Sequence, residues 1–397
     1  MVDVATIATL VVAAIASLFM AWAIGAGSSG STPFAPAVGA NAISVMRAGF
    51  LVGLLGFAGA VLQGANVSEA VGRELIVGVT LSAEAATVGL LTAAVLVAIG
   101  VFLGYPIATA FTVTGAIVGV GLALGGDPAW AKYREITALW VLTPFVGGGI
   151  AYATARLLRS ERAPESYTVP LLAGIVGVML ANIEFALLGP PDVSMTVSAA
   201  AASATDAPAI AGIDVVQAGV TLVFALLCAL AVGYDMRRDQ DHAQRRFLLA
   251  LGALVAFSAG GSQVGLAIGP LLPLFDPFGL PLTAILVGGG IGLLAGSWTG
   301  APRMIKAIAQ DYSSLGPRRS IAALIPSFAI AQTAVLFGIP VSFNEIIVSA
   351  VVGSGYAAGT GGVSKGKMGY TVLAWIGSLV LSIVLSYGIF TAVQWVL

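Results

Sequence analysis

Glu345 is the residue whose type and position could do the most distinctive chemistry. It follows the tripeptide Gly338-Ile-Pro inside an apolar stretch, 321–360, with Ser342 and Asn344 just before it. A carboxylate at membrane depth is costly and indicates function by default. Apolar surroundings disfavour its charged form, so Glu345 could take up and release a proton near neutral pH. The alternative is a structural carboxylate that hydrogen-bonds Asn344 or Ser342 and only shapes this turn.

A second polar group lies in the stretch FSAGGSQVGLAIGP at 257–270, with Ser262 and Gln263 at its centre. Four glycines and Pro270 weaken this stretch as a helix. In lipid, freed backbone groups are tolerated only where they line a cavity buried in protein. A membrane helix broken beside polar side chains therefore predicts a binding site. The alternative is a helix that glycine and proline kink for packing alone.

The composition identifies the elements that position these groups as membrane-spanning helices. The 397 residues are 58% hydrophobic and 9% charged, whereas a soluble domain carries about 25% charged residues. We therefore expect an all-α polytopic membrane protein in the lipid bilayer. The N-terminal apolar run has no preceding Lys or Arg, so we interpret it as a retained span.

Several function classes are disfavoured. The net charge of −1 leaves no basic face for nucleic acid. Cys228 and His242 are single residues of their types, so neither a disulfide framework nor a Cys/His metal site can form. The sequence offers no Ser/His pair, metal cluster or phosphate loop of the kind that an enzyme would need. We therefore expect neither an enzyme nor a cofactor.

The spans recur at an offset of 234 residues. At this offset Gly104-Tyr-Pro aligns with Gly338-Ile-Pro, and Ser28 aligns with Ser262. Two breaks about eighty residues apart keep one register, which indicates an internal repeat. The expected units are a first repeat at 1–160 (broken helix 4–40, hairpin 85–124), connecting spans and a cytoplasmic linker at 161–246, and a second repeat at 247–397 (broken helix 247–275, hairpin 321–360).

Positive charge predicts the orientation of these units, because Lys and Arg prefer cytoplasmic loops. If the end of the span that carries Arg47 faces the cytoplasm, 14 of the 17 Lys and Arg residues lie on the cytoplasmic side. The exceptions are Arg73, Lys132 and Arg134. Both termini are then external. An odd number of crossings separates the repeats, which predicts two inverted repeats, and we interpret each hairpin as re-entrant. Broken helices and hairpin tips would then meet near the midplane.

These motifs resemble those of the inorganic phosphate transporter (PiT) family, whose members carry a GANDVAN-type motif and a GLPVSTTH-type hairpin in each half. The chain has GGSQVGLAIGP at 260–270, AGSSGSTPFAP at 26–36, GYPIATAF at 104–111 and GIPVSFNE at 338–345. The resemblance spans nearly the whole chain. It implies a membrane carrier of a tetrahedral oxyanion, built as two inverted repeats.

The chain departs from that family at the polar positions. Ser28 and Ser262 stand at the family's Asn positions, and Ser29 and Gln263 stand at its Asp positions. Donor side chains nevertheless remain, and we expect an anion site made by Ser28, Ser29, Thr32, Thr109, Ser262, Gln263, Ser342 and Asn344. The loss of carboxylates argues against strong sodium coupling, and we expect Glu345 to couple protons; coupling to H⁺ or Na⁺ stays open.

The leading interpretation is a secondary active carrier of inorganic phosphate in the plasma membrane. A proton-coupled sulfate permease of the same fold is the alternative, because sulfate needs donors only. A non-transporting membrane protein or a passive pore is a further alternative. The oligomeric state, including a homodimer, is open. Glu184, the other acid at membrane depth, is expected to have a structural or interface role.

Overall fold

The computed structural model describes residues 4–190, 194–205, 209–210, 213–357, 359 and 363–396. Within them, nine helices are long and apolar enough to cross a membrane. These nine are α1 (Val4–Gly27), α3 (Val45–Gln63), α5 (Ala83–Leu103), α7 (Trp130–Leu158), α10 (Val215–Arg238), α11 (Gln240–Ile268), α13 (Leu282–Thr299), α15 (Pro317–Leu336) and α17 (Lys365–Val396). The prediction of an all-α polytopic membrane protein is confirmed.

Shorter elements connect these spans. The helices are α2 (Ala35–Gly39), α4 (Ala65–Arg73), α6 (Thr109–Ala123), α8 (Glu165–Ala181), α9 (Val197–Ser203), α12 (Leu272–Phe275), α14 (Ala301–Asp311) and α16 (Phe343–Tyr356), with 3₁₀ turns η1 (Gly269–Leu271) and η2 (Asp276–Phe278). Three two-residue antiparallel pairs complete the list: β1 (Ile76–Val77) with β2 (Asp127–Pro128), β3 (Glu184–Phe185) with β4 (Met195–Thr196), and β5 (Ala209–Ile210) with β6 (Ile213–Asp214).

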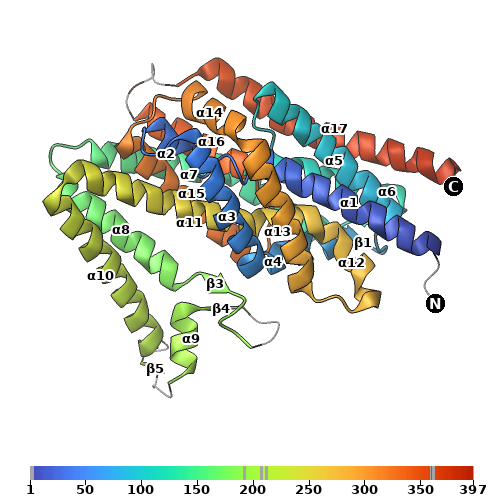
Figure 1. Cartoon of the computed structure of the whole chain (residues 1–397), viewed down its shortest axis with the longest axis horizontal. Helices are drawn as coiled ribbons and strands as arrows, with labels where there is room; N and C mark the ends of the chain where they lie inside the picture. The colour runs from blue at the N-terminus through green and yellow to red at the C-terminus, as the bar shows by residue number, and fades with distance from the viewer. Residues whose placement is uncertain are drawn as a thin grey trace.

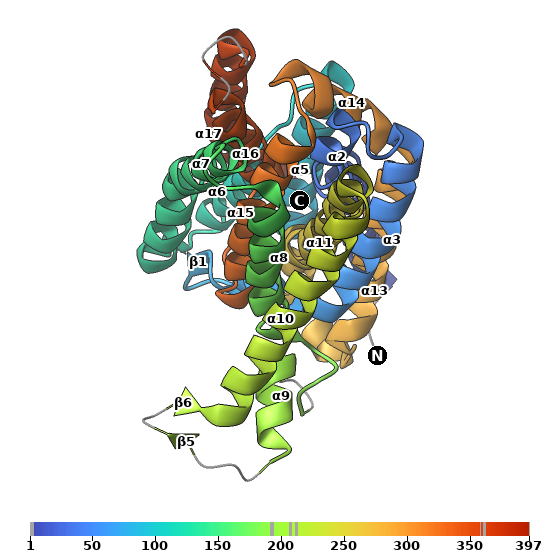
Figure 2. The same cartoon turned by 90° about the vertical axis from the view of Figure 1, so that its left-hand side faces the viewer.

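The long helices other than α10 form one bundle, and the start of α1 and the end of α17 lie at the same end of the molecule (Figure 1). Helices α8, α9 and α10 project away from the main body (Figures 1 and 2). Helix α10 packs mainly on α8 and α9. Most of the buried core lies among the remaining helices, and the predicted site residues lie on these helices or in the turns that join them.

Helices of the two halves exchange partners in a regular way. Helix α1 packs on α5 and α13, while α11 packs on α15 and α3. Helix α6 packs on α17, while α16 packs on α7. At an offset of 235 residues the indole nitrogens follow the same rule: Trp140 donates to the Pro340 carbonyl, and Trp375 donates to the Pro106 carbonyl, both at 2.8 Å.

The first predicted helix break lies where the sequence indicates it. Helix α1 ends at Gly27, and hydrogen-bonded turns lead through 28–34 into α2. The amide nitrogens of Ser28 and Ser29 both donate to the Ile24 carbonyl, at 2.8 and 3.1 Å. These bonds satisfy groups that the end of the helix would otherwise leave free.

The second break lies later than predicted. Helix α11 continues through Ser262 and Gln263 to Ile268, and the change to 3₁₀ geometry comes at Gly269 and Pro270. The glycines before it serve close packing instead: a Cβ on Gly260 would lie 1.8 Å from the Gly56 carbonyl oxygen of α3. The expectation of a break at the polar pair is therefore corrected, because α3 and α4 press against an intact helix.

The charged segment 234–246 also differs from the expected linker. Helix α10 continues to Arg238 and α11 begins at Gln240, so only Asp239 separates them. The Asp239 carboxylate accepts a hydrogen bond from the His242 amide at 3.1 Å, which caps α11. A single capping residue thus replaces the predicted loop.

Both Gly-X-Pro breaks form the tips of helical hairpins. Gly104 ends α5 with φ 72°, and Gly338 follows α15 with φ 59°. Glycine adopts this left-handed conformation without a Cβ penalty, and the following proline cannot continue a helix. Each hairpin has a long arm, α5 or α15, and a short arm, α6 or α16, that begins inside the protein.

Candidate functional site

Gln263 joins the two halves of the chain at the centre of the site. Its Oε1 accepts hydrogen bonds from Thr109 Oγ1 at 2.8 Å and from Ser28 Oγ at 3.3 Å. Its Nε2 donates to the Val341 carbonyl at 2.5 Å. One side chain of α11 thus holds the end of α1, the start of α6 and the second hairpin together.

Asn344 makes the second connection between the halves. Its Nδ2 donates to the Gly27 carbonyl at 2.9 Å and to the Ile107 carbonyl at 2.6 Å. The two hairpin tips and the end of α1 therefore meet, as the repeat argument predicts.

The N-termini of α6 and α16 both point into this region. The residues before them, Ala108 and Ser342, make no side-chain cap bond. The first backbone bonds of these helices run from Thr112 to Ala108 and from Ile346 to Ser342, so the preceding amides of the first turn have no intrahelical acceptor. Two neighbouring helix N-termini whose first amides have neither a side-chain cap nor an intrahelical acceptor are suited to an anion.

Four buried polar atoms around these helix ends have no hydrogen-bond partner: Ser262 Oγ, Ser342 Oγ, Asn344 Oδ1 and Glu345 Oε2. Their side chains belong to residues that are at most 2% exposed. A buried polar group without a partner is destabilising and requires a reason. A ligand that both accepts and donates hydrogen bonds would satisfy these atoms.

The predicted residues divide into two groups. Ser28, Thr109, Gln263 and Asn344 are joined by hydrogen bonds to one another or to the hairpin tips. Thr32 Oγ1 instead donates to the Ser28 carbonyl at 3.0 Å, so this hydroxyl stabilises the turn after α1. Ser29 is buried in that same turn.

Sequence reasoning missed the carbonyl groups that orient the two amides. These are the backbone oxygens of Gly27, Ile107 and Val341. Carbonyl oxygens carry no residue-type signal. Their only indication in the sequence was their position beside a helix end or a Gly-X-Pro tip.

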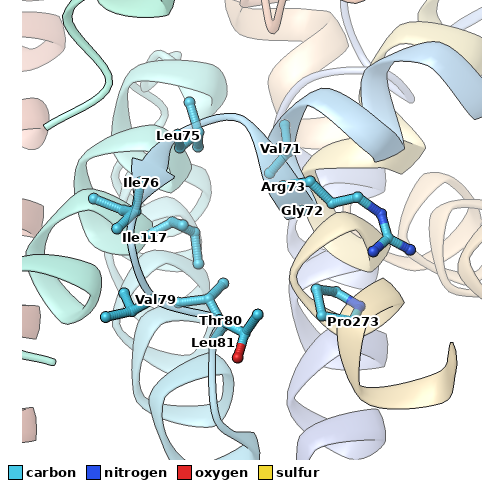
Figure 3. A pocket seen from close by; sticks show the side chains of 10 residues that line it. All are labelled: Val71, Gly72, Arg73, Leu75, Ile76, Val79, Thr80, Leu81, Ile117 and Pro273. Atoms are coloured by element: carbon cyan, nitrogen blue, oxygen red, sulfur yellow. The ribbon is translucent and has the colours of Figure 1, made fainter. Parts of the chain in front are cut away.

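The predicted site residues are buried, and the pocket drawn in Figure 3 lies away from them. Figure 3 shows one pocket of about 160 Å³ with walls from α4, the segment after it, α6 and α12. Its Arg73 guanidinium bonds Glu69 and Asp276 at 2.6 and 2.9 Å and is therefore already neutralised. The full lining is Val71, Gly72, Arg73, Leu75, Ile76, Val79, Thr80, Leu81, Ile117 and Pro273, and it includes none of the predicted site residues.

Together these features define a polytopic helical membrane protein that encloses a polar site where its two halves meet. The chain belongs to the phosphate transporter family, whose model matches residues 24–386. The resemblance to the PiT family is thereby confirmed.

Individual relatives match over most of the chain. A protein of Thermococcus kodakarensis named as a candidate phosphate permease is 23% identical, with 96% of this chain and 97% of that protein covered. A chloroplastic inorganic phosphate transporter of Arabidopsis thaliana is 24% identical, with 90% of this chain and 68% of that protein covered. A solved structure titled as a sodium-dependent phosphate transporter matches with a TM-score of 0.81 at 21% identity, covering 98% of this chain and 100% of the other.

Proposed function

We propose that this protein carries inorganic phosphate across the membrane by alternating access. The observation that carries the proposal is the meeting of two uncapped helix N-termini, α6 and α16, beside four buried polar atoms without partners. Backbone N–H groups and the positive ends of helix dipoles attract an anion without any Lys or Arg. Membership of the phosphate transporter family supports phosphate as the cargo.

Two inverted repeats would supply the alternation. Three observations support them: the offset of 234, the exchange of helix partners between halves, and the matched tryptophan bonds to Pro106 and Pro340. In such an architecture the two halves rock about a fixed central site. The buried position of the site corresponds to an occluded state of this cycle.

Phosphate also suits the acceptors present. At neutral pH phosphate carries one or two protons, so it needs acceptors as well as donors, whereas sulfate needs donors only. Asn344 Oδ1 and Glu345 Oε2 are buried without donors of their own. A phosphate hydroxyl would satisfy either atom, which favours phosphate over the sulfate alternative.

Glu345 is the proposed proton-coupling group. It is 2% exposed, lies in the first turn of α16 and has no salt-bridge partner among the described residues. A lone buried carboxylate is costly when charged. Proton uptake together with phosphate would remove that cost during the crossing.

The membrane location and orientation belong to the same proposal. We infer a plasma-membrane protein with both termini external and each hairpin re-entrant. A Gln240→Cys variant in a Cys228→Ala background would test the orientation with a membrane-impermeant thiol reagent. Labelling from the external side would contradict the assignment.

Uptake of labelled phosphate into proteoliposomes tests the function. We expect uptake driven by a proton gradient, with weak competition by sulfate and little added effect of a sodium gradient. Strong sulfate competition would identify the sulfate permease instead. Gradient-independent equilibration would indicate a passive pore, and absence of uptake would indicate a non-transporting protein.

A further inference from the structure

Among the described residues, a chain of polar side chains lies beside the site, in which Gln63 and Ser258 are buried and Gln332 is half-buried. The amides of Gln63 on α3 and Gln332 on α15 hydrogen-bond each other at 3.4 and 3.1 Å. Gln332 Nε2 also donates to Ser258 Oγ on α11 at 2.6 Å. Ser258 precedes Ser262 by one helical turn, so both hydroxyls lie on the same face of α11.

This chain reaches a surface pocket at its other end. Gln332 lines a pocket of about 440 Å³, together with Asn182, Glu184 and Thr333. Gln63 Nε2 donates to the Glu184 carbonyl at 2.6 Å. The Gln63–Gln332–Ser258 cluster therefore links the pocket to the helical turn of α11 that precedes the unpartnered Ser262 hydroxyl.

Gly261 allows Gln63 of α3 to pack closely against α11. A Cβ at Gly261 would lie 2.7 Å from Cβ of Gln63. The Gln63 side chain therefore packs directly on the backbone that carries Ser262 and Gln263. Nearby, Asn66 Nδ2 donates to the Val335 carbonyl on α15 at 3.2 Å.

The equivalent positions in the other half have no such chain. At an offset of 234, Ser258, Gln332 and Gln63 correspond to Ile24, Ala98 and Ser297. Ser297 Oγ donates within its own helix, to the Leu293 carbonyl at 2.8 Å. The packing of the equivalent helices in the first half therefore does not depend on side-chain amides.

We propose that Gln63, Gln332 and Ser258 form the closed gate of an aqueous route between the central site and the pocket at Glu184. The inference rests on the proposed function, because only a carrier needs the site to exchange with a face. Interhelical hydrogen bonds in membranes are individually weak, so they can break and re-form as α15 moves away from α3 and α11. Once parted, the same groups line the route with donors and acceptors for a hydrated ion.

Thiol labelling tests the gate without any transport measurement. Cys228 is the single cysteine of the chain, so Cys228→Ala gives a cysteine-free background for Ser258→Cys. Sided vesicles are treated with a membrane-impermeant methanethiosulfonate. We expect slow labelling from the face that carries Glu184, and an increase of about tenfold when Gln332→Leu is added, because the closed state loses its interhelical hydrogen bonds.

Ile24→Cys is the matched control, and Gln332→Leu should leave its labelling unchanged. Gln332→Asn serves as a second variant if Gln332→Leu does not fold, since the shorter amide cannot reach both partners. Unchanged labelling of Ser258→Cys in both variants, or equal acceleration at Ile24→Cys, would overturn the gate. Accelerated labelling without phosphate uptake would keep the gate and reject phosphate as the cargo.

Discussion

The two halves of the molecule share a scaffold but carry different functional groups. The first half presents hydroxyls and backbone amides at the site, from Ser28, Thr109 and the start of α6. The second half supplies the amides of Gln263 and Asn344 and the carboxyl of Glu345. At the position equivalent to Glu345, the first half has Phe111.

Phe111 shows what that difference means physically. Its ring stacks on Trp140 with centroids 3.9 Å apart, and Trp140 in turn bonds the second hairpin at Pro340. At this position the first half therefore has a packing residue, while the second half has a carboxyl group that can exchange a proton. Alternating access by inverted repeats requires the two repeats to have similar backbone structures. Their side chains can still differ, so that each repeat has a different chemical role.

The largest expected effect is at Glu345. Glu345→Gln keeps the shape and hydrogen-bonding capacity but cannot exchange a proton. Since positioned proton-transfer groups contribute about a hundredfold or more, we expect proton-driven phosphate uptake to fall by about that factor and to keep only the pH dependence that the titration of phosphate itself produces. Uptake against external pH, in proteoliposomes, measures this.

Glu161→Gln is the matched control, because Glu161 is an exposed carboxylate in the turn after α7. It should leave the pH profile unchanged. A Glu345→Gln protein with wild-type rate and pH dependence would leave Glu345 a structural residue and remove the chemical contrast between the halves.

The next largest effect is expected when Gln263→Ala is compared with Ser29→Ala. These two positions are equivalent at the offset of 234. Gln263→Ala removes the shared partner of Ser28, Thr109 and the Val341 carbonyl. Thr109 Oγ1 still donates to Ser28 Oγ at 3.4 Å, so the Val341 carbonyl is the group left unsatisfied, at a cost of about 1–3 kcal/mol. We expect phosphate affinity to fall by about tenfold to a hundredfold. Ser29→Ala should change affinity by less than about threefold.

Equilibrium binding of labelled phosphate to detergent-solubilised protein distinguishes the two variants. Equal losses in both would mean that the halves contribute alike to the site, against the division described above.

Equivalent substitutions at packing positions of the two halves should, in contrast, have similar effects on stability. Trp140→Phe and Trp375→Phe each remove one indole donor from a proline carbonyl at a hairpin tip. Interhelical hydrogen bonds in membranes average about 0.6 kcal/mol, so both variants should lower thermal stability slightly and by similar amounts. A thermal-shift assay compares them, and a large decrease in only one would argue against equivalent hairpins.

The smallest effect is expected at the surface pair Arg73–Asp276. The hydrogen bond from Arg73 holds the pKa of Asp276 below its ordinary value. Stability from this pair is therefore present above the unfolded-state pKa and is lost as pH falls through the lower folded-state value. Exposed pairs contribute little, so Asp276→Asn should reduce stability slightly at pH 7 and match wild type in acid. A pH-independent difference would assign the effect to something other than the carboxylate charge.

Much of the fold followed from composition and from the repeat, because apolar length and Gly-X-Pro tips are strong local signals. The break in 247–275 was misplaced, since the four glycines at 260–269 could indicate either a weak helix or close packing. Only the partner helices decide between these, and α3 and α4 press tightly on Gly260 and Gly265.

The site was predictable to a different extent. Ser28 and Gln263, which the sequence placed in one site, hydrogen-bond each other at 3.3 Å. The Gln63–Gln332 pair was not predicted, since the residues are 269 positions apart and belong to no repeated motif. Long-range pairs of single amides leave no periodic signal in one sequence.

The central claim is that one anion is held between the N-termini of α6 and α16. Determining the structure with arsenate, a phosphate analogue with anomalous scattering, tests this claim directly. We predict an arsenic peak within hydrogen-bond reach of the backbone N–H groups at Thr109 and Phe343 and of the Ser262 and Ser342 hydroxyls. A peak confined to other parts of the protein, or no peak at a concentration that saturates phosphate uptake, would contradict it.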